Sequence, residues 1–420
     1  MCLACLAAYA CAKSDVDNAP TDLDAGIDAT APSRDAGDGG REPLVGTVCG
    51  DRTGLEEGSG WPALGGCAKR ASFLETQGPF GPTSFDVASV DGGVAPVVRK
   101  DGAVAFVDGH DLVIEAGGVL LERLNVGRTI THVPVLLEDA RVLLVLESRT
   151  LTLFDRKLAV RVQNTSVQDA GSADAEAGAS DATAPGPVAA EWSLDLGGAA
   201  SEITFAKNMI YATVGSELLA IVMKASAPAW RVPLGAPSGL AVAITGGGLA
   251  VATTRTGHIT FVGARGEIVG TTDVGAPVSA PATLSKDDVL CVGDQAGRVH
   301  LFTKDRTIAD VDVGAPVTTA CAQDGFGTVF VGAGAKLYAV DRDGTVRFVY
   351  ATNGALAPPV IGSNGVVYAA SADGHAYAID EGGLLVWAAT LRSPVTVAPA
   401  LGPGRALHVM TARGLTTVGP

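Results

Sequence analysis

Several features that would assign a protein to a common class are absent from this sequence. It has no run of eighteen apolar residues, so no segment is expected to span a membrane. Long stretches of helical periodicity are scarce, aromatic residues make up only 5%, and the 30 basic residues are outnumbered by 45 acidic ones. The net charge of −15 makes nucleic acid and anionic membrane surfaces poor partners.

Motifs that carry chemistry are missing as well. There is no P-loop, no H-E-x-x-H, and no G-x-S-x-G in the context of a nucleophile elbow. None of the seven cysteines has zinc-finger spacing. We therefore expect no catalytic residues, no bound metal and no cofactor.

The sequence does contain a repeat. A unit of about forty residues runs from Ala315 to Gly354 and recurs at once from Ala355 to Ser393. Each copy has four short apolar runs separated by Gly and Asp turns, which predicts a four-stranded antiparallel meander. Four glycines, Gly235, Gly275, Gly314 and Gly354, keep the phase at 40, 39 and 40 residues. The 54 glycines of the chain fit many tight turns between short strands.

Repeated meanders of this length indicate an all-β protein, an eight-bladed β-propeller of four-stranded antiparallel blades. Propeller units are expected over residues 92–420, preceded by a lead-in at 47–91 that lies on the fold surface with Trp61 buried. The last unit stops after three strands. Residues 83–88 are placed to supply its outer strand and close the ring. Seven blades is the alternative.

Two acidic segments interrupt the globular pattern, at residues 12–46 and 164–190. Both are rich in Asp, Ala, Gly, Ser, Thr and Pro, which cannot bury enough apolar surface to order themselves. We expect both to be disordered. The second should lie between the third and fourth strands of the second blade.

Residues 1–11 are apolar, small and Cys-bearing, like the end of a secretory signal. Cys11 after Ala10 resembles the lipidated cysteine of a bacterial lipoprotein, although no basic segment precedes the apolar stretch. These features predict an exported protein, periplasmic, anchored to the outer membrane as a lipoprotein, or extracellular. Cys49 and Cys67 are the candidate disulfide, whereas Cys291 and Cys321 are interpreted as free buried thiols.

One polar position recurs from blade to blade. It directly follows the turn between the second and third strands, and that turn lies on the same face as the connections between blades. These side chains should therefore lie around one face of the ring. They either form a rim that binds a partner, or they are half-exposed strand starts where polar residues are tolerated. One residue per blade is too dispersed for a metal site. The positions are His110, Glu217, His258, Arg298, Lys336 and His375.

The two repeats at residues 315–393 also carry a family motif. Tyr377-Ala378-Ile379-Asp380, followed by Gly382-Gly383 and Trp387, resembles the repeat of PQQ-type (pyrroloquinoline quinone) propellers. The preceding unit has the same pattern, and Trp61-Pro62 resembles the lead-in of such proteins. The resemblance implies that the aromatic residue packs against the neighbouring blade while Asp and Gly shape the turn.

Two functions are compatible with this resemblance. The first is a non-catalytic scaffold at the cell envelope, similar to the propeller lipoprotein of the outer-membrane β-barrel assembly machinery, monomeric and bound to protein partners. Its only contact with a membrane would be a lipid anchor. The alternative is a PQQ-dependent dehydrogenase or small-ligand-binding propeller that uses the central channel. The family of quinone dehydrogenases implies a vicinal disulfide and calcium-binding acids near the ring centre, and this sequence has no Cys-Cys pair.

Overall fold

The computed structural model describes residues 48–161, with gaps at 50–51, 58, 60, 75–76 and 89–92, and residues 186–419. The predicted signal (1–11) with Cys11, the acidic segment 12–46 and most of the acidic insert (164–185) lie outside the described residues. All of the structure below belongs to the unit that runs from Pro43 to Pro420.

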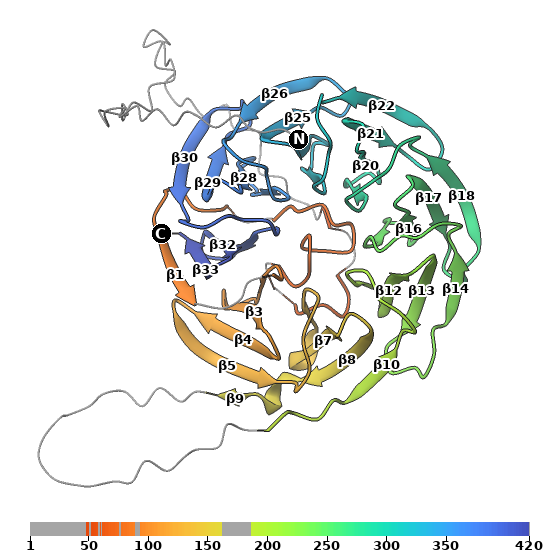
Figure 1. Cartoon of the computed structure of the whole chain (residues 1–420), viewed down its shortest axis with the longest axis vertical. Helices are drawn as coiled ribbons and strands as arrows, with labels where there is room; N and C mark the ends of the chain where they lie inside the picture. The colour runs from red at the N-terminus through yellow and green to blue at the C-terminus, as the bar shows by residue number, and fades with distance from the viewer. Residues whose placement is uncertain are drawn as a thin grey trace, which may run out of the picture. The chain divides into compact units, whose positions relative to one another are not determined.

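Eight antiparallel sheets follow one another around a ring, and each contributes one blade with its first strand at the centre (Figure 1). The eight-bladed propeller is thereby confirmed and the seven-bladed alternative is excluded. The first four blades are β2 (Val97–Val98), β3 (Val104–Asp108), β4 (Asp111–Ala116) and β5 (Val119–Asn125); β6 (Val135–Leu136), β7 (Arg141–Leu146), β8 (Thr150–Asp155) and β10 (Trp192–Asp195); β11 (Thr204–Ala206), β12 (Met209–Val214), β13 (Glu217–Val222) and β14 (Trp230–Pro233); and β15 (Ala243–Ile244), β16 (Ala250–Thr253), β17 (His258–Val262) and β18 (Ile268–Asp273).

The second half of the ring repeats this order. Its blades are β19 (Thr283–Leu284), β20 (Leu290–Gly293), β21 (Arg298–Phe302) and β22 (Thr307–Asp312); β23 (Ala322–Gln323), β24 (Val329–Ala333), β25 (Lys336–Val340) and β26 (Val346–Ala351); β27 (Val360–Ile361), β28 (Val367–Ala370), β29 (His375–Ile379) and β30 (Leu385–Thr390); and β31 (Ala400–Gly402), β32 (Ala406–Thr411) and β33 (Gly414–Val418).

The last blade takes its outer strand from the other end of the propeller sequence. Strand β1 (Ser84–Ala88) pairs antiparallel with β33, with Ser84 opposite Val418. The hydroxyl of Thr416 donates to Asp86 Oδ1 at 2.9 Å, and the Gly419 N–H donates to the Thr83 carbonyl at 3.0 Å. The ring-closing strand predicted at residues 83–88 is confirmed. It removes the exposed edge that a three-stranded sheet would leave.

The acidic insert leaves from the second blade, between β8 and β10 as the sequence predicts. A short 3₁₀ turn, η2 (Arg156–Leu158), follows β8, and β9 (Val160–Arg161) then pairs with β5 as a fifth strand on the first blade. A second 3₁₀ turn, η1 (Glu138–Ala140), lies between β6 and β7.

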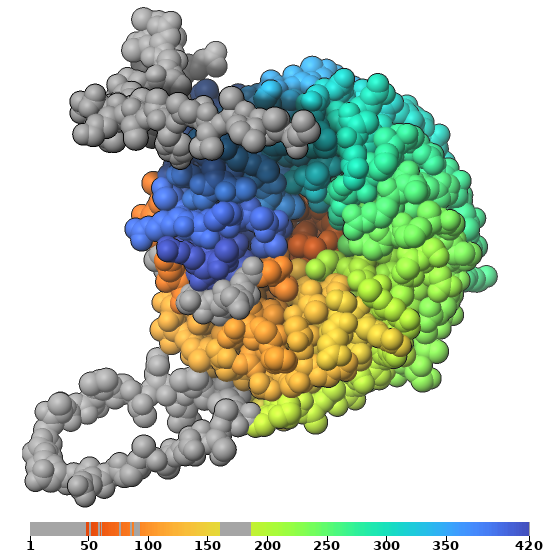
Figure 2. Space-filling model, viewed as in Figure 1, coloured from red at the N-terminus to blue at the C-terminus, as the bar shows by residue number. Residues whose placement is uncertain are grey.

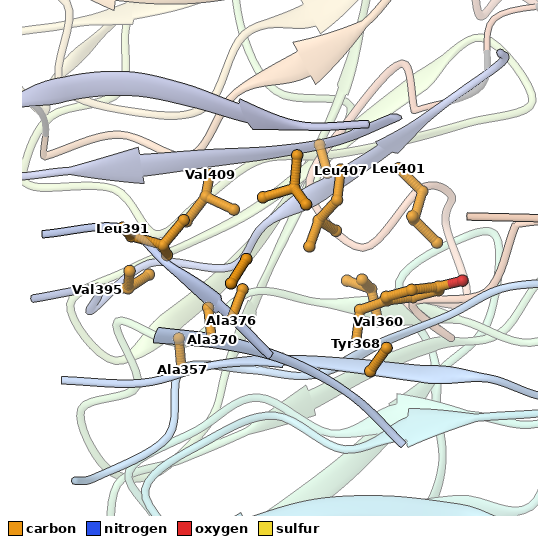
Figure 3. Close-up of a cluster of buried hydrophobic side chains, with 14 of the residues drawn as sticks. Ala357, Val360, Tyr368, Ala370, Ala376, Leu391, Val395, Leu401, Leu407 and Val409 are labelled. Atoms are coloured by element: carbon orange, nitrogen blue, oxygen red, sulfur yellow. The ribbon is translucent and has the colours of Figure 1, made fainter. Parts of the chain in front are cut away.

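Apolar side chains fill the spaces between blades, because a middle strand has a neighbouring blade on each face. All five residues of β24 are buried, whereas every residue of the outer strand β26 is exposed or half-buried. Figure 3 shows one such interface, in which Tyr368 and Val360 of the seventh blade lie opposite Leu401 and Leu407 of the eighth. This interdigitated packing provides the core of the propeller.

Outer-strand aromatics pack on turn glycines of the next blade, as the family resemblance implies. Gly383 (φ +87°) lies against Phe348, and a Cβ at this glycine would meet the Phe348 ring at 2.6 Å. Gly266 (φ +85°) lies against Trp230 in the same way. Asp380 shapes its turn by accepting the N–H groups of Gly382 and Leu384 at 2.9 and 2.8 Å.

One expectation about cysteine is wrong. Cys291 of β20 and Cys321, which precedes β23, form a disulfide between the fifth and sixth blades, with a Cα–Cα distance of 6.3 Å. Both residues are buried, so the sequence pattern of two apolar runs did not distinguish a crosslink from two thiols.

Candidate functional site

The lead-in segment does not lie on the surface. The described residues between 48 and 74, which we call the central plug, run through the middle of the ring and hydrogen-bond to inner strands of six blades. Inner strands are sheet edges with unpaired backbone groups, and a segment that passes across their ends can satisfy those groups. The bonds are Trp61 to Val98, Leu136 to Pro62, Ile244 to Ala68, Leu284 to Lys69, Gln323 to Ala71 and Ile361 to Ser72.

The plug is held by buried side chains as well as by backbone bonds. Trp61 is 1% exposed and packs in the interface between the seventh, eighth and first blades. A disulfide joins Cys49 to Cys67, with a Cα–Cα distance of 5.5 Å. Lys69 forms an ion pair with Asp288 at 2.7 Å, which ties the plug to the fifth blade.

A buried ion network fixes the start of the plug. Arg156 Nη2 lies 2.9 Å from Glu56 Oε1, and its Nη1 lies 3.6 Å from Glu122 Oε2. Arg99 contacts the same two carboxylates at 3.8 and 3.1 Å. The four charges connect the plug to the first and second blades, and removing one would leave two like charges to share a single partner away from water.

The plug occupies one end of the channel. One face of the ring carries the turns between second and third strands and the connections from blade to blade. We call it the connection face. Each inner strand starts at that face, and the plug bonds to the last inner-strand residues, such as Ile244 and Gln323. It therefore closes the channel near the opposite face and leaves a funnel toward the connection face. Figure 2 shows the ring centre hollowed, with residues in the red to orange of the plug at its floor.

All six predicted rim residues lie on the connection face, one per blade. His110 directly precedes β4, and the other five are the first residues of β13, β17, β21, β25 and β29. His110, Arg298 and Lys336 are exposed, and the other three are half-exposed. No hydrogen bond or ion pair joins any two of the six. The structure therefore spreads them around the face and does not gather them into one site.

The charges of this face divide into two parts. On the first three blades, exposed arginines are paired, as in Arg149 with Asp195 at 2.7 Å and Arg231 with Glu217 at 3.0 Å. On the fourth to eighth blades, five exposed cations have no ion pair with any described carboxylate. This cationic arc consists of Arg255, Arg298, Lys336, Arg392 and Arg413.

A buried arginine lies at the floor of the funnel. Arg70 belongs to the plug, is 4% exposed, and reaches toward the connection face to Thr204, where Nη1 donates to Oγ1 at 3.4 Å. Burial lowers the pKa of Arg70 to about 10, although the charge of nearby Glu202 opposes the shift. Burial likewise raises the pKa of Glu202, whose Oε2 accepts the Val133 N–H at 3.0 Å.

A cavity of about 200 Å³ lies between the last and first blades. Its walls include Glu115 of β4 and His408 of β32, each of which has one buried side-chain atom without a partner among the described residues. His408 Nδ1 lies 2.9 Å from Thr417 Oγ1, and burial lowers the pKa of His408 to about 4.

The ring centre does not fit the ligand set that the quinone dehydrogenases imply. Within the described ranges, no three His, Cys, Asp or Glu side chains gather in a geometry for a metal ion. The disulfide near the centre joins residues 18 positions apart and is not vicinal. Within those same ranges there is also no helix with the length and apolar character required to cross a bilayer.

Comparisons with known proteins agree with the repeat motif. Residues 295–417 match the sequence family described as outer membrane protein assembly factor BamB. A comparison with curated proteins gives no match. The crystal structure of BamB from Moraxella catarrhalis aligns with a TM-score of 0.58 at 15% identity, over 80% of this chain and 97% of that one.

Two other solved structures share the architecture. The quinohemoprotein alcohol dehydrogenase ADHIIG from Pseudomonas putida HK5 aligns with a TM-score of 0.62 at 12% identity, over 86% of this chain and 77% of that one. The computationally designed Ika8 protein aligns with a TM-score of 0.61 at 13% identity, over 80% and 99%.

The closed ring of four-stranded blades is an eight-bladed β-propeller, and its Tyr-Ala-x-Asp repeats are similar to those of PQQ-type propellers. Within that class the chain resembles BamB, in fold over most of its length and in sequence over residues 295–417.

Sequence reasoning missed the plug and Arg70. The signal lies just after Trp61-Pro62, because Gly65 and Gly66 adopt positive φ where the plug turns back. Nothing in the sequence placed that turn inside the ring.

Proposed function

We propose that this propeller is a non-catalytic, exported scaffold that binds a protein partner at the cell envelope through its connection face. The observation that carries the proposal is the cationic arc together with the rim residues. Exposed charges that form no ion pair within the protein steer and orient a partner of complementary charge. The opposite end of the channel is closed by the plug, so the connection face is the accessible route to the ring centre.

Export is supported by the two disulfides, Cys49–Cys67 and Cys291–Cys321, since such bonds persist in oxidising compartments. The similarity to BamB over residues 295–417 supports an envelope location and a role in binding proteins. Lipidation at Cys11 and a monomeric propeller remain part of the proposal. Mass spectrometry of the mature N-terminus tests the anchor, and an unmodified Met1 would contradict export.

A photo-crosslinking amino acid placed on each face tests the scaffold proposal. Lys336 and His258 report on the connection face, whereas Asp287 and Arg342, both exposed in turns on the opposite face, serve as matched controls. Crosslinking in the native envelope should give the same discrete protein adduct at Lys336 and His258. The controls should give none.

Two results would contradict the proposal. One is the absence of a reproducible adduct at either connection-face position. The other is an adduct of equal yield at Asp287 and Arg342, which would show that the connection face is not the preferred surface.

A further inference from the structure

We propose that Arg70 is an anion-binding group at the floor of the funnel and that it takes a carboxylate entering from the connection face. This site is distinct from the exposed rim. It stands on the surroundings of one buried cation and does not depend on the identity of a protein partner.

The first step concerns what Arg70 lacks. A guanidinium has five N–H donors in a planar fork, and buried charges in proteins are normally paired. Arg70 is 4% exposed, yet its side chain makes a single hydrogen bond of 3.4 Å to Thr204 among the described residues. No described carboxylate forms an ion pair with it. The remaining donors are available to a ligand.

The second step concerns the negative charge that lies near Arg70 within the described part of the chain. The negative charge of Glu202 favours the charged form of Arg70, but the two side chains do not form an ion pair. The carboxylate of Glu202 instead accepts the Val133 N–H at 3.0 Å. The position of Glu202 is fixed by that backbone bond, two residues before β11. Arg70 thus has a compensating charge close by, while its side chain donates only to Thr204 among the described residues.

The third step concerns the backbone that holds Arg70. The residue has φ +57°, and its N–H donates to the Cys67 carbonyl at 2.9 Å, directly beside the Cys49–Cys67 disulfide. The adjacent Lys69 and Ala71 accept bonds from Leu284 and Gln323. Because both neighbours are fixed to inner strands, the guanidinium is pre-organised, which lowers the entropy cost of binding.

The fourth step concerns the class of ligand. A planar, bidentate oxyanion matches the geometry of a guanidinium fork, and a carboxylate is the simplest such group. The cationic arc surrounds the funnel on five blades and would raise the local concentration of anions. The carboxylate can come from a free small acid or from an acidic side chain of a bound protein.

Isothermal titration of the full, disulfide-intact chain at pH 7 and low ionic strength tests the site. The two probes are succinate and an acetylated, amidated tetraglutamate peptide, which separate the two sources. We expect saturable one-to-one binding of at least one probe. Arg70→Gln should weaken it at least tenfold, and Glu202→Gln, which removes a competing negative charge and retains an acceptor for Val133, should strengthen it about threefold or more.

Arg413→Gln provides the control, because it removes one charge of the arc and should change affinity by no more than about twofold. Binding of neither probe at millimolar concentration would overturn the proposal. Binding that Arg70→Gln leaves unchanged would do the same. If Arg70→Gln does not fold, Glu202→Gln decides alone, and an unchanged or weakened affinity in that variant refutes the site.

Discussion

The buried histidine at the ring closure predicts a specific loss of stability in mild acid. His408 is 5% exposed between the last and first blades, with Nε2 unpartnered among the described residues. Burial lowers its pKa from 6.5 to about 4, so the folded protein keeps the imidazole neutral. The unfolded chain binds this proton as the pH falls below 6.5. The stability contribution is therefore complete above pH 6.5 and is lost as the pH falls toward 4.

The size of the loss follows from proton linkage. Between pH 7.5 and 5.0, a shift from 6.5 to about 4 reduces the free energy of unfolding by about 2 kcal/mol. Urea unfolding at these two pH values should show this change in the native protein and not in His408→Gln. His110→Gln, at an exposed position, should behave like the native protein. An identical pH dependence in native protein and His408→Gln would refute the reasoning, because other titrating groups would then account for all of it.

Three further changes test other contacts by urea unfolding. Arg156→Met should cost about 3 kcal/mol, because it leaves the carboxylates of Glu56 and Glu122 with Arg99 alone as their cation among the described residues, and adding Glu56→Gln should recover part of the loss. The double variant Cys291→Ala, Cys321→Ala should cost about 3.5 kcal/mol from the entropy of a loop of 30 residues, and a native protein that keeps its stability in reductant would contradict this. Gly383→Ala should cost about 1–3 kcal/mol from positive φ and contact with Phe348, whereas Gly382→Ala, at a non-positive φ, should cost less.

The architecture was predictable because its determinants are local and repeated. Each blade needs glycines at its turns, and Gly235, Gly275, Gly314 and Gly354 keep one phase along the chain. A ring must also be closed, which identified residues 83–88 as an outer strand once the last unit had only three. The rim positions follow from the same phase, because the turn between the second and third strands always lies on the connection face.

The plug and the inter-blade disulfide were not predictable in the same way. Residues 48–74 occur once and have no strand or helix periodicity, so nothing local distinguishes a segment in the channel from one on the surface. Cys291 and Cys321 occupy apolar runs of different blades, and their proximity depends on how neighbouring blades are offset. Arg70 and Glu202 are 132 positions apart and meet only because the plug crosses the inner strand of the third blade.

The plug also bears on which function the propeller can serve. A central channel that is open at both ends offers a cofactor or substrate two routes and a set of free inner-strand edges. Here six of those edges are bonded by the chain's own lead-in, and a disulfide and a buried ion network hold that lead-in in place. We therefore expect recognition at the connection face and in the funnel above Arg70. The cationic arc and Arg70 place positive charge along this route, although the chain as a whole carries a net charge of −15.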